Sequence, residues 1–175
     1  AENAAANGVT FVFDERVVVI AKNAGTAKWE VKTAEGMEFT AKAVVNCAGI
    51  RSYEINNLVS ATKYAITARR GEYLMLDKDE DEDGTFSATM FQVPSRMGKG
   101  ILVSPTVDGT VIVGPTAEDI PDKDDKATTY EGLEKVKSGA KRTYPALPLD
   151  KVITEFSGLR AHETTVGDFI IGEAP

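Results

Sequence analysis

The segment AVVNCAG at residues 43–49 limits the possible folds more than any other part of the sequence. Its β-branched apolar residues end abruptly in Cys47, Ala48 and Gly49, which is typical of a buried parallel strand that presents backbone to a nucleotide. A glycine-rich phosphate-binding turn normally opens such a domain, and the 175 residues contain no such turn. The segment therefore predicts a later strand of a nucleotide-binding α/β domain.

Both ends of the sequence are typical of interrupted elements. AENAAA at residues 1–6 has a helix-forming composition and stops at Asn7 and Gly8, a common helix end. At the other terminus, DFIIGEAP stops where an apolar strand would finish. We therefore expect an internal fragment of a larger protein.

Short apolar runs separated by turn residues predict the organisation of residues 1–49. VTFVF at residues 9–13 suits a buried strand. RVVVIAK, AKWEVKT and MEFTAKAVVNCAG follow, separated by NAG and AEG, and these spacings indicate a β-meander that ends in the strand at residues 43–47. A strand, a meander and a second strand predict the latter half of an α/β nucleotide-binding domain.

Residues 50–165 predict a second, α+β domain, with a mainly antiparallel sheet and one main helix. AITARRGEYLMLD, TMFQVPS and DKVITEFSGLRAHE are expected strands, and DFIIGE is a further one at residues 168–173. Two β-rich runs flank Asp108 and Gly109, which favours a hairpin with a type I′ turn. TTYEGLEKVKSGAKRTYPAL predicts the helix, with apolar residues at helical spacing and a stop at Pro145.

Composition excludes several classes of function. The formal net charge is −7, from 20 Lys and Arg against 27 Asp and Glu, which argues against nucleic acid or an anionic membrane surface as partner. One Cys and one His are too few for a zinc site, so we expect no metal. No run approaches the roughly 18 to 20 apolar residues of a transmembrane segment. With a single Cys and no signal peptide, we expect a cytoplasmic protein, with peripheral membrane association of the full-length protein as the alternative.

The acidic run DKDEDEDG resembles the first half of an EF-hand loop, with Asp79, Asp81 and Asp83 at ligand spacing. The bidentate Glu of such a loop would fall on Met90, and both flanks have strand composition where an EF-hand has helices. We therefore expect a solvated loop rather than a calcium site.

The stretch FSGLRAHE offers the best candidates for chemistry. In an extended strand, Arg160 and His162 point to the same face of a sheet. A guanidinium can bind a carboxylate or phosphate through two hydrogen bonds, and an imidazole can accept a proton near neutral pH. The pair therefore suits a small anionic substrate, with His162 as the base. The alternative is an exposed arginine and a surface histidine without chemistry.

Arg69, Arg70 and Cys47 are further candidates for the site. Arg69 and Arg70 face opposite ways in a strand, so only one of them can share a pocket with Arg160, and we expect Arg70 to do so. A plain edge strand is the alternative. Cys47 has no base near it in the sequence, so we expect a packed strand residue rather than a nucleophile.

Several segments together resemble the FAD-dependent oxidoreductases of the D-amino-acid oxidase superfamily. They are VVNCAGIRS, ITARRGEYLMLDK, GKGILVSPTVDGTVIVGPTAEDI, EFSGLRAHE and DFIIGEAP, in this order. The most similar branch contains glycerol-3-phosphate dehydrogenases and oxidases and L-2-hydroxyglutarate oxidases. The resemblance implies that the phosphate-binding turn precedes Ala1. It also implies that Cys47, Ala48 and Gly49 bring backbone near the FAD, and that Val17 meets the adenine through its backbone.

The resemblance also implies a division of the chain and a reaction. Residues 1–49 would belong to the FAD-binding domain, residues 50–165 to the substrate-binding domain, and residues 166–175 to the return into the FAD-binding domain. Arg160 matches the arginine of the family's G-L-R-P stretch, which holds a substrate carboxylate or phosphate, although Ala161 replaces the proline. His162 has no assigned counterpart.

The implied reaction is oxidation of a small anionic secondary alcohol by hydride transfer to flavin. Glycerol 3-phosphate is the expected substrate, or a 2-hydroxy acid such as L-2-hydroxyglutarate. The full-length protein would bind FAD, whereas this chain alone would hold no flavin, be inactive, and need the remainder of its own FAD-binding domain as partner. The alternatives are a free-standing module that binds a small anion without redox activity, and an amine substrate as in amino-acid oxidases.

Overall fold

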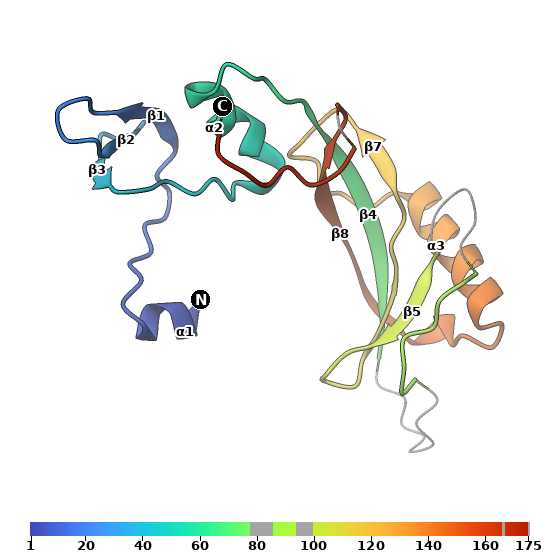
Figure 1. Cartoon of the computed structure of the whole chain (residues 1–175). Coiled ribbons are helices and arrows are strands. Elements are labelled where there is room, and N and C mark those ends of the chain that lie inside the picture. Colours follow the sequence, from blue (N-terminus) through green and yellow to red (C-terminus); the bar gives the residue numbers. More distant parts are fainter. Residues whose placement is uncertain (78–85, 94–99, 166, 175) are drawn as a thin grey trace. The chain divides into compact units, whose positions relative to one another are not determined.

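The computed structural model describes residues 1–77, 86–93, 100–165 and 167–174 (Figure 1). The chain divides into two compact units. Unit 1 comprises Ala1–Ala65 with Thr165–Pro175, and unit 2 comprises Ile66–Thr164. The acidic segment at residues 79–84, on which the calcium hypothesis rests, lies outside the described residues.

Unit 1 contains a short helix and the predicted meander. Helix α1 (Glu2–Ala6) stops at Asn7 and Gly8, as expected, and Gly8 has a φ of +86°, which favours glycine. Strands β1 (Val17–Lys22), β2 (Trp29–Thr33) and β3 (Glu38–Ala41) pair antiparallel in the order β1-β2-β3. The meander is therefore confirmed.

Three apolar segments of unit 1 were predicted as strands, and these predictions are wrong. Residues 9–13, 43–47 and 168–173 form no strand, and their apolar side chains include the largely exposed Phe13, Val45 and Ile171. A strand is stabilised by hydrogen bonds to its neighbours, and the described part of the chain supplies no strand that pairs with these three segments. Cys47 is consequently exposed rather than packed.

The boundary between the two compact units lies after Ala65. The 3-10 turn η1 (Gly49–Arg51) leads directly into helix α2 (Ser52–Val59), which the sequence did not predict. Helix α2 contacts β1 and therefore belongs to unit 1. Glu54 on this helix lies 3.6 Å from the Arg16 guanidinium, Oε2 to Nη2, just before β1.

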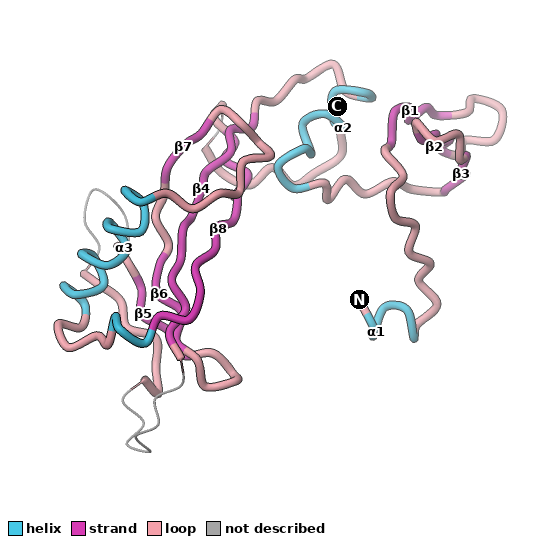
Figure 2. Tube along the Cα trace, turned by 180° about the vertical axis from the view of Figure 1, so that it is seen from behind, coloured by secondary structure: helices cyan, strands magenta, loops and turns pink. Residues whose placement is uncertain are grey.

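Unit 2 is built on an antiparallel sheet around one long central strand, β4 (Ile66–Leu76). Strand β8 (Val152–Glu163) pairs with β4 over its whole length, and the two run side by side in Figures 1 and 2. Strands β6 (Val111–Gly114) and β7 (Glu118–Ile120) share the other edge of β4, and β5 (Leu102–Pro105) lies beyond β6.

The predicted strand TMFQVPS is wrong, because its described residues give only an isolated bridge between Met90 and Val103. The predicted hairpin between β5 and β6 is confirmed, but its turn differs. The Gly109 N–H donates to the Thr106 carbonyl at 3.2 Å, and the Thr106 N–H donates to the Thr110 carbonyl at 2.8 Å. Gly109 has a φ of +88°, whereas Asp108 does not have the positive φ of a type I′ turn. This pattern fits a type I turn followed by a glycine bulge.

The predicted helix is confirmed as α3 (Tyr130–Thr143), which ends before Pro145. It begins at a Thr129 cap, whose Oγ1 accepts from the Gly132 N–H at 3.0 Å. A short 3-10 turn, η2 (Leu149–Lys151), precedes β8. The core between α3 and one face of the sheet consists of buried apolar residues: Leu74, Leu76, Ile101, Val103, Val111, Val113, Val136, Ala140 and Leu147.

Burial along β4 alternates between the two faces of the sheet. Ala68, Leu74 and Leu76 are buried on the face that α3 covers, whereas Thr67, Tyr73 and Met75 on the other face are only half-buried. We call this second side of β4 and β8 the open face. Within the described ranges, no helix is long and apolar enough to cross a membrane.

Candidate active site

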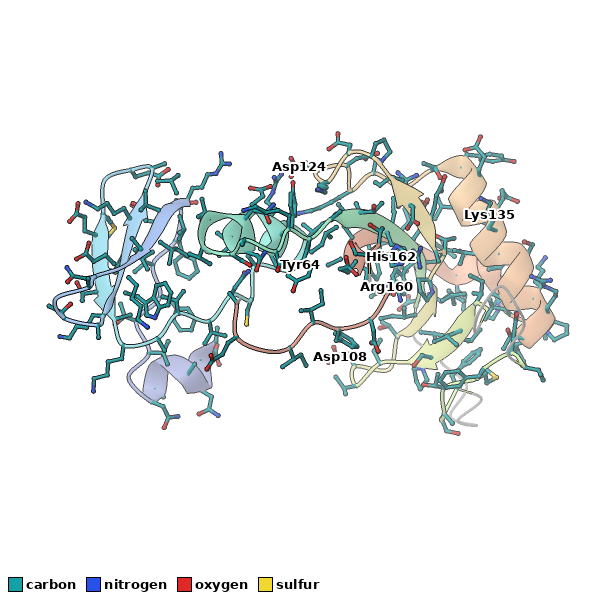
Figure 3. The ribbon with its side chains drawn as sticks, turned by 45° about the horizontal axis from the view of Figure 1, so that its top comes forward. Tyr64, Asp108, Asp124, Lys135, Arg160 and His162 are labelled. Carbon is teal, nitrogen blue, oxygen red and sulfur yellow. The ribbon has the colours of Figure 1, made fainter. Side chains whose placement is uncertain are left out.

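The strand register places the candidate residues of β8 on the open face. Arg160 lies opposite Arg69, and His162 lies opposite Thr67. Directly opposed residues of an antiparallel pair project to the same side of the sheet. Arg160 and His162 therefore share a face, as the sequence predicted, and Figure 3 shows them together on this strand.

The two arginines on this face differ in their partners. Arg69 holds Asp119 of β7 in a two-point ion pair, with Nε donating to Oδ1 at 2.6 Å and Nη2 donating to Oδ2 at 2.8 Å. Arg160 is exposed, and no carboxylate of the described residues lies within ion-pair distance of its guanidinium. The charge of Arg69 is thus compensated, and that of Arg160 is available to an anion.

Asp119 is kept ionised by this arrangement. The hydrogen bond from Arg69 lowers the pKa of the Asp119 carboxyl below its ordinary value, the charges of Arg69 and His162 act in the same direction, and partial desolvation opposes them. The same hydrogen bond raises the pKa of Arg69. Asp119 could not be predicted from the sequence, because its approach to His162 depends on β7 and β8 pairing with opposite edges of β4.

The His162 side chain is half-buried, and its Nδ1 atom is enclosed without a hydrogen-bond partner among the described residues. This nitrogen lies 3.6 Å from Oδ2 of Asp119. The open face therefore combines an uncompensated guanidinium with an imidazole and a carboxylate.

Two further features shape the open face next to Arg160. Gly158 lies two residues before Arg160 on the same face, and a Cβ added there would meet nothing within 4 Å. Beyond Gly158, Phe156 stacks on Tyr73 of β4 with ring centroids 5.1 Å apart. A glycine in a strand interior permits close approach of a ligand. Gly158 therefore leaves open space on the sheet surface between the Arg160 guanidinium and the aromatic pair.

Arg70 does not share a pocket with Arg160, and this expectation is corrected. Arg70 alternates with Arg69 along β4, so its side chain lies on the face covered by α3, where it is only 7% exposed. Its guanidinium is within ion-pair distance of three carboxylates, those of Glu72, Glu118 and Asp125, at 3.4, 3.6 and 3.2 Å. Arg69, not Arg70, accompanies Arg160.

Glu72 connects this buried cluster to α3. Its carboxylate accepts from the Thr129 N–H at 2.7 Å and from Thr129 Oγ1 at 2.9 Å, at the first turn of the helix. The carboxylate is completely buried beside the Arg70 guanidinium. The positive end of a helix favours such a negative group, so this cluster stabilises the position of α3.

The four residues expected near FAD all belong to unit 1. Val17 opens β1, where a register shift between Val17 and Val19 interrupts the ladder with β2. Cys47 and Ala48 lie in the loop after β3, and the Ala48 N–H donates to Asn46 Oδ1 at 3.2 Å. Gly49 has a φ of +54°, and a Cβ added there would meet nothing within 4 Å. Cys47, Ala48 and Gly49 are exposed, whereas Val17 is half-buried.

Glu54 on helix α2 connects the segment that contains Val17 to the segment that contains Gly49. Burial would raise the pKa of the Glu54 carboxyl, but hydrogen bonds from Arg51 and Tyr53 and the charges of Arg51 and Arg16 outweigh burial, so its pKa is lowered. The ionised Glu54 thereby links Arg16, which precedes Val17, to the helix that follows Gly49. Across the part of the chain that the structure describes, no cluster of three or more His, Cys, Asp or Glu residues could hold a metal ion.

Comparison with known proteins gives consistent results. The model of the family described as DAO, FAD dependent oxidoreductase, matches residues 1–175. The glycerol 3-phosphate dehydrogenase of Caloramator mitchellensis is 44% identical over 99% of this chain and 35% of its own length. The chain spans about a third of the length of the curated relatives it matches.

Several solved structures resemble the fold, and two are described here. One is the FAD-bound L-alpha-glycerophosphate oxidase of Mycoplasma pneumoniae, with a TM-score of 0.85 and 29% identity over 99% of this chain and 45% of that chain. The other is the glycine oxidase of Geobacillus kaustophilus, with a TM-score of 0.76 and 20% identity over 98% of this chain and 42% of that chain. The latter likeness concerns the fold alone.

Proposed function

Since the chain belongs to the DAO family of FAD dependent oxidoreductases, we propose that it carries the substrate-binding face of an enzyme that oxidises a small anionic secondary alcohol. Glycerol 3-phosphate is the proposed substrate, because a relative 44% identical over nearly the whole chain is a glycerol 3-phosphate dehydrogenase. A 2-hydroxy acid such as L-2-hydroxyglutarate presents the same two groups, an anion and a secondary hydroxyl, and is the second choice.

The observation that carries this proposal is the uncompensated charge of Arg160 on the open face, beside His162. A guanidinium that has no carboxylate partner within the described part of the chain, in a protein of net charge −7, is suited to a small anion from solution. Arg69 does not compete for that anion, because its two hydrogen bonds to Asp119 occupy it.

The residues of the open face have separate roles in the proposed reaction. Arg160 binds the phosphate or carboxylate through two hydrogen bonds and so fixes the orientation of the substrate. Gly158 leaves room for the carbon chain, and the stacked Tyr73 and Phe156 shield it from water. His162 accepts the hydroxyl proton at Nε2, because its Nδ1 is enclosed and lies toward Asp119.

FAD, when bound, supplies the acceptor for the hydride of the substrate carbon. In this chain, the exposed backbone of Cys47, Ala48 and Gly49 would hold one side of the nucleotide, and the interrupted ladder at Val17 would meet its adenine. The chain lacks a glycine-rich phosphate-binding turn. We therefore infer that these four residues alone bind FAD weakly.

The test uses the full-length protein that contains this chain, purified with FAD and kept free of oxygen. Glycerol 3-phosphate, L-2-hydroxyglutarate and glycine are added separately, and loss of the visible flavin absorption is followed. We expect glycerol 3-phosphate to bleach the flavin fastest. Fastest bleaching by glycine would establish an amine substrate instead. If no compound bleached the flavin while glycerol 3-phosphate still bound, the anion-binding module without redox activity would replace this proposal.

A further inference from the structure

We propose that Asp119 is a positioning residue for His162: its carboxylate accepts a hydrogen bond from Nδ1–H of the imidazole and thereby leaves Nε2 free to accept a proton on the open face. The catalytic consequence rests on the proposed function, in which His162 is the base. The orientation itself is a property of this chain alone.

The topology of the sheet brings the two residues together. Strand β7 pairs with one edge of β4, with Asp119 opposite Arg69, and β8 pairs with the other edge, with His162 opposite Thr67. Asp119 and His162 therefore reach over the same face of β4 from opposite sides. Their facing atoms, Oδ2 and Nδ1, are 3.6 Å apart.

Arg69 makes the carboxylate a fixed acceptor rather than a mobile one. Its Nε and Nη2 atoms hold both oxygens of Asp119, at 2.6 and 2.8 Å. A carboxylate oxygen can accept more than one hydrogen bond, so Oδ2 still has capacity for the imidazole N–H. Catalytic hydrogen bonds are often long without substrate and tighten when it binds. A small rotation of the His162 ring would shorten the 3.6 Å separation between Nδ1 and Oδ2 of Asp119 to hydrogen-bond distance.

The enclosed Nδ1 atom needs such a partner. It is shielded from solvent and makes no hydrogen bond within the described residues. A buried polar atom without a hydrogen-bond partner is destabilising, and the carboxylate of Asp119 is an acceptor at the right position. If Nδ1 instead carried the lone pair, that lone pair would face a negative charge. The proton therefore belongs on Nδ1 when the ring is neutral.

The direct test is the ¹⁵N NMR spectrum of the imidazole, which is unambiguous because the 175-residue chain has a single histidine. With the ring neutral, we expect Nδ1 to resonate as a protonated nitrogen and Nε2 as an unprotonated one. Asp119→Ala should shift the population toward the form protonated at Nε2. Asp108→Asn, which removes a carboxylate at the hairpin turn, should leave the spectrum of the ring unchanged. A neutral ring protonated at Nε2 in the unsubstituted chain, or no change in Asp119→Ala, would overturn the proposal.

A kinetic comparison separates positioning from simple compensation of Arg69. In the full-length enzyme with FAD, Asp119→Ala should lower kcat about 10- to 100-fold, by analogy with the partners that orient metal-bound histidines, with a smaller change in KM. Asp119→Glu should restore part of kcat. A change in KM alone would show that Asp119 acts only on the charge of Arg69. The NMR result does not depend on turnover, so protonation at Nδ1 together with an unimportant His162 would contradict the proposed function and leave this inference standing.

Discussion

At the scale of single residues, the role of each arginine is decided by the strand that pairs beside it. Arg69 and Arg160 lie directly opposite each other, and both project onto the open face. Strand β7 places Asp119 against Arg69 but supplies no carboxylate to Arg160. One guanidinium therefore has a structural role, and the other remains free for a ligand.

Gly158 provides a prediction at this scale. Gly158→Val adds a side chain where a Cβ has nothing within 4 Å, and valine favours a strand, so the free energy of unfolding should change by no more than about 1 kcal/mol. In the full-length enzyme, the added side chain should fill the open space beside Arg160 and raise KM for the substrate about tenfold or more. A tenfold change corresponds to ~1.4 kcal/mol of binding free energy. Chemical denaturation and steady-state kinetics measure the two effects.

The matched control is Thr154→Val, which makes the same kind of change on the same face and the same strand, farther from Arg160. It should alter neither stability nor KM appreciably. An unchanged KM in Gly158→Val would place the substrate away from Gly158.

At the scale of elements, buried charges tie α3 to the sheet. Glu72 on β4 is hydrogen-bonded to the helix cap at Thr129 and lies beside Arg70, which in turn reaches Asp125 and Glu118. Removing one member of a buried ion pair leaves an uncompensated charge, which is strongly destabilising. The cluster therefore holds α3, and with it the covered side of the sheet, independently of any ligand.

Gly132 gives a prediction for this cluster. A Cβ added at Gly132 would overlap the Glu72 carboxylate, so Gly132→Ala should destabilise unit 2 although alanine favours a helix. We expect a loss of about 1 to 3 kcal/mol in the free energy of unfolding, as in overpacked cores. Far-UV circular dichroism during urea denaturation measures it. Gly158→Ala is the control, because it adds the same methyl group in open space. Equal stability of the two variants would contradict the packing described for Glu72.

The sequence predicted elements well where their partners are local. The meander of β1, β2 and β3, the hairpin at Gly109 and helix α3 all depend on turns, caps and periodicity that can be read within a few residues. The apolar runs at residues 9–13, 43–47 and 168–173 have strand composition but no paired strand among the described residues. Composition alone cannot distinguish these two cases, because pairing is a property of the whole sheet.

The candidate site was predicted only in part, for the same reason. Alternation along a single strand correctly placed Arg160 and His162 on one face. The choice between Arg69 and Arg70 required the register between β4 and β8, and recognising Asp119 required the short β7, three residues long. Register is set by contacts between strands distant in the sequence, so these features became visible only in the structure.

At the scale of the whole molecule, the small number of proposed FAD contacts leads to a prediction about FAD affinity. The proposed FAD contacts are limited to Val17 and residues 47–49, and the sequence has no glycine-rich phosphate-binding turn. Titration of the purified 175-residue chain with FAD, followed by flavin fluorescence, should therefore show no tight binding. The full-length protein is the positive control. Tight binding that yields a yellow 175-residue chain would show that these few residues suffice.

Binding of the substrate's anionic group by Arg160 is tested most directly by changing both the residue and the substrate. Flavin reduction by glycerol 3-phosphate and by glycerol is measured in the full-length protein and in its Arg160→Ala variant, with Arg142→Ala on the exposed side of α3 as control. We expect Arg160→Ala to lower kcat/KM for glycerol 3-phosphate, with a loss of about 2 to 4 kcal/mol in transition-state stabilisation. The rate with glycerol, which has no phosphate, should be nearly unchanged. Equal losses with both substrates, or no loss with either, would contradict a contact between Arg160 and the phosphate.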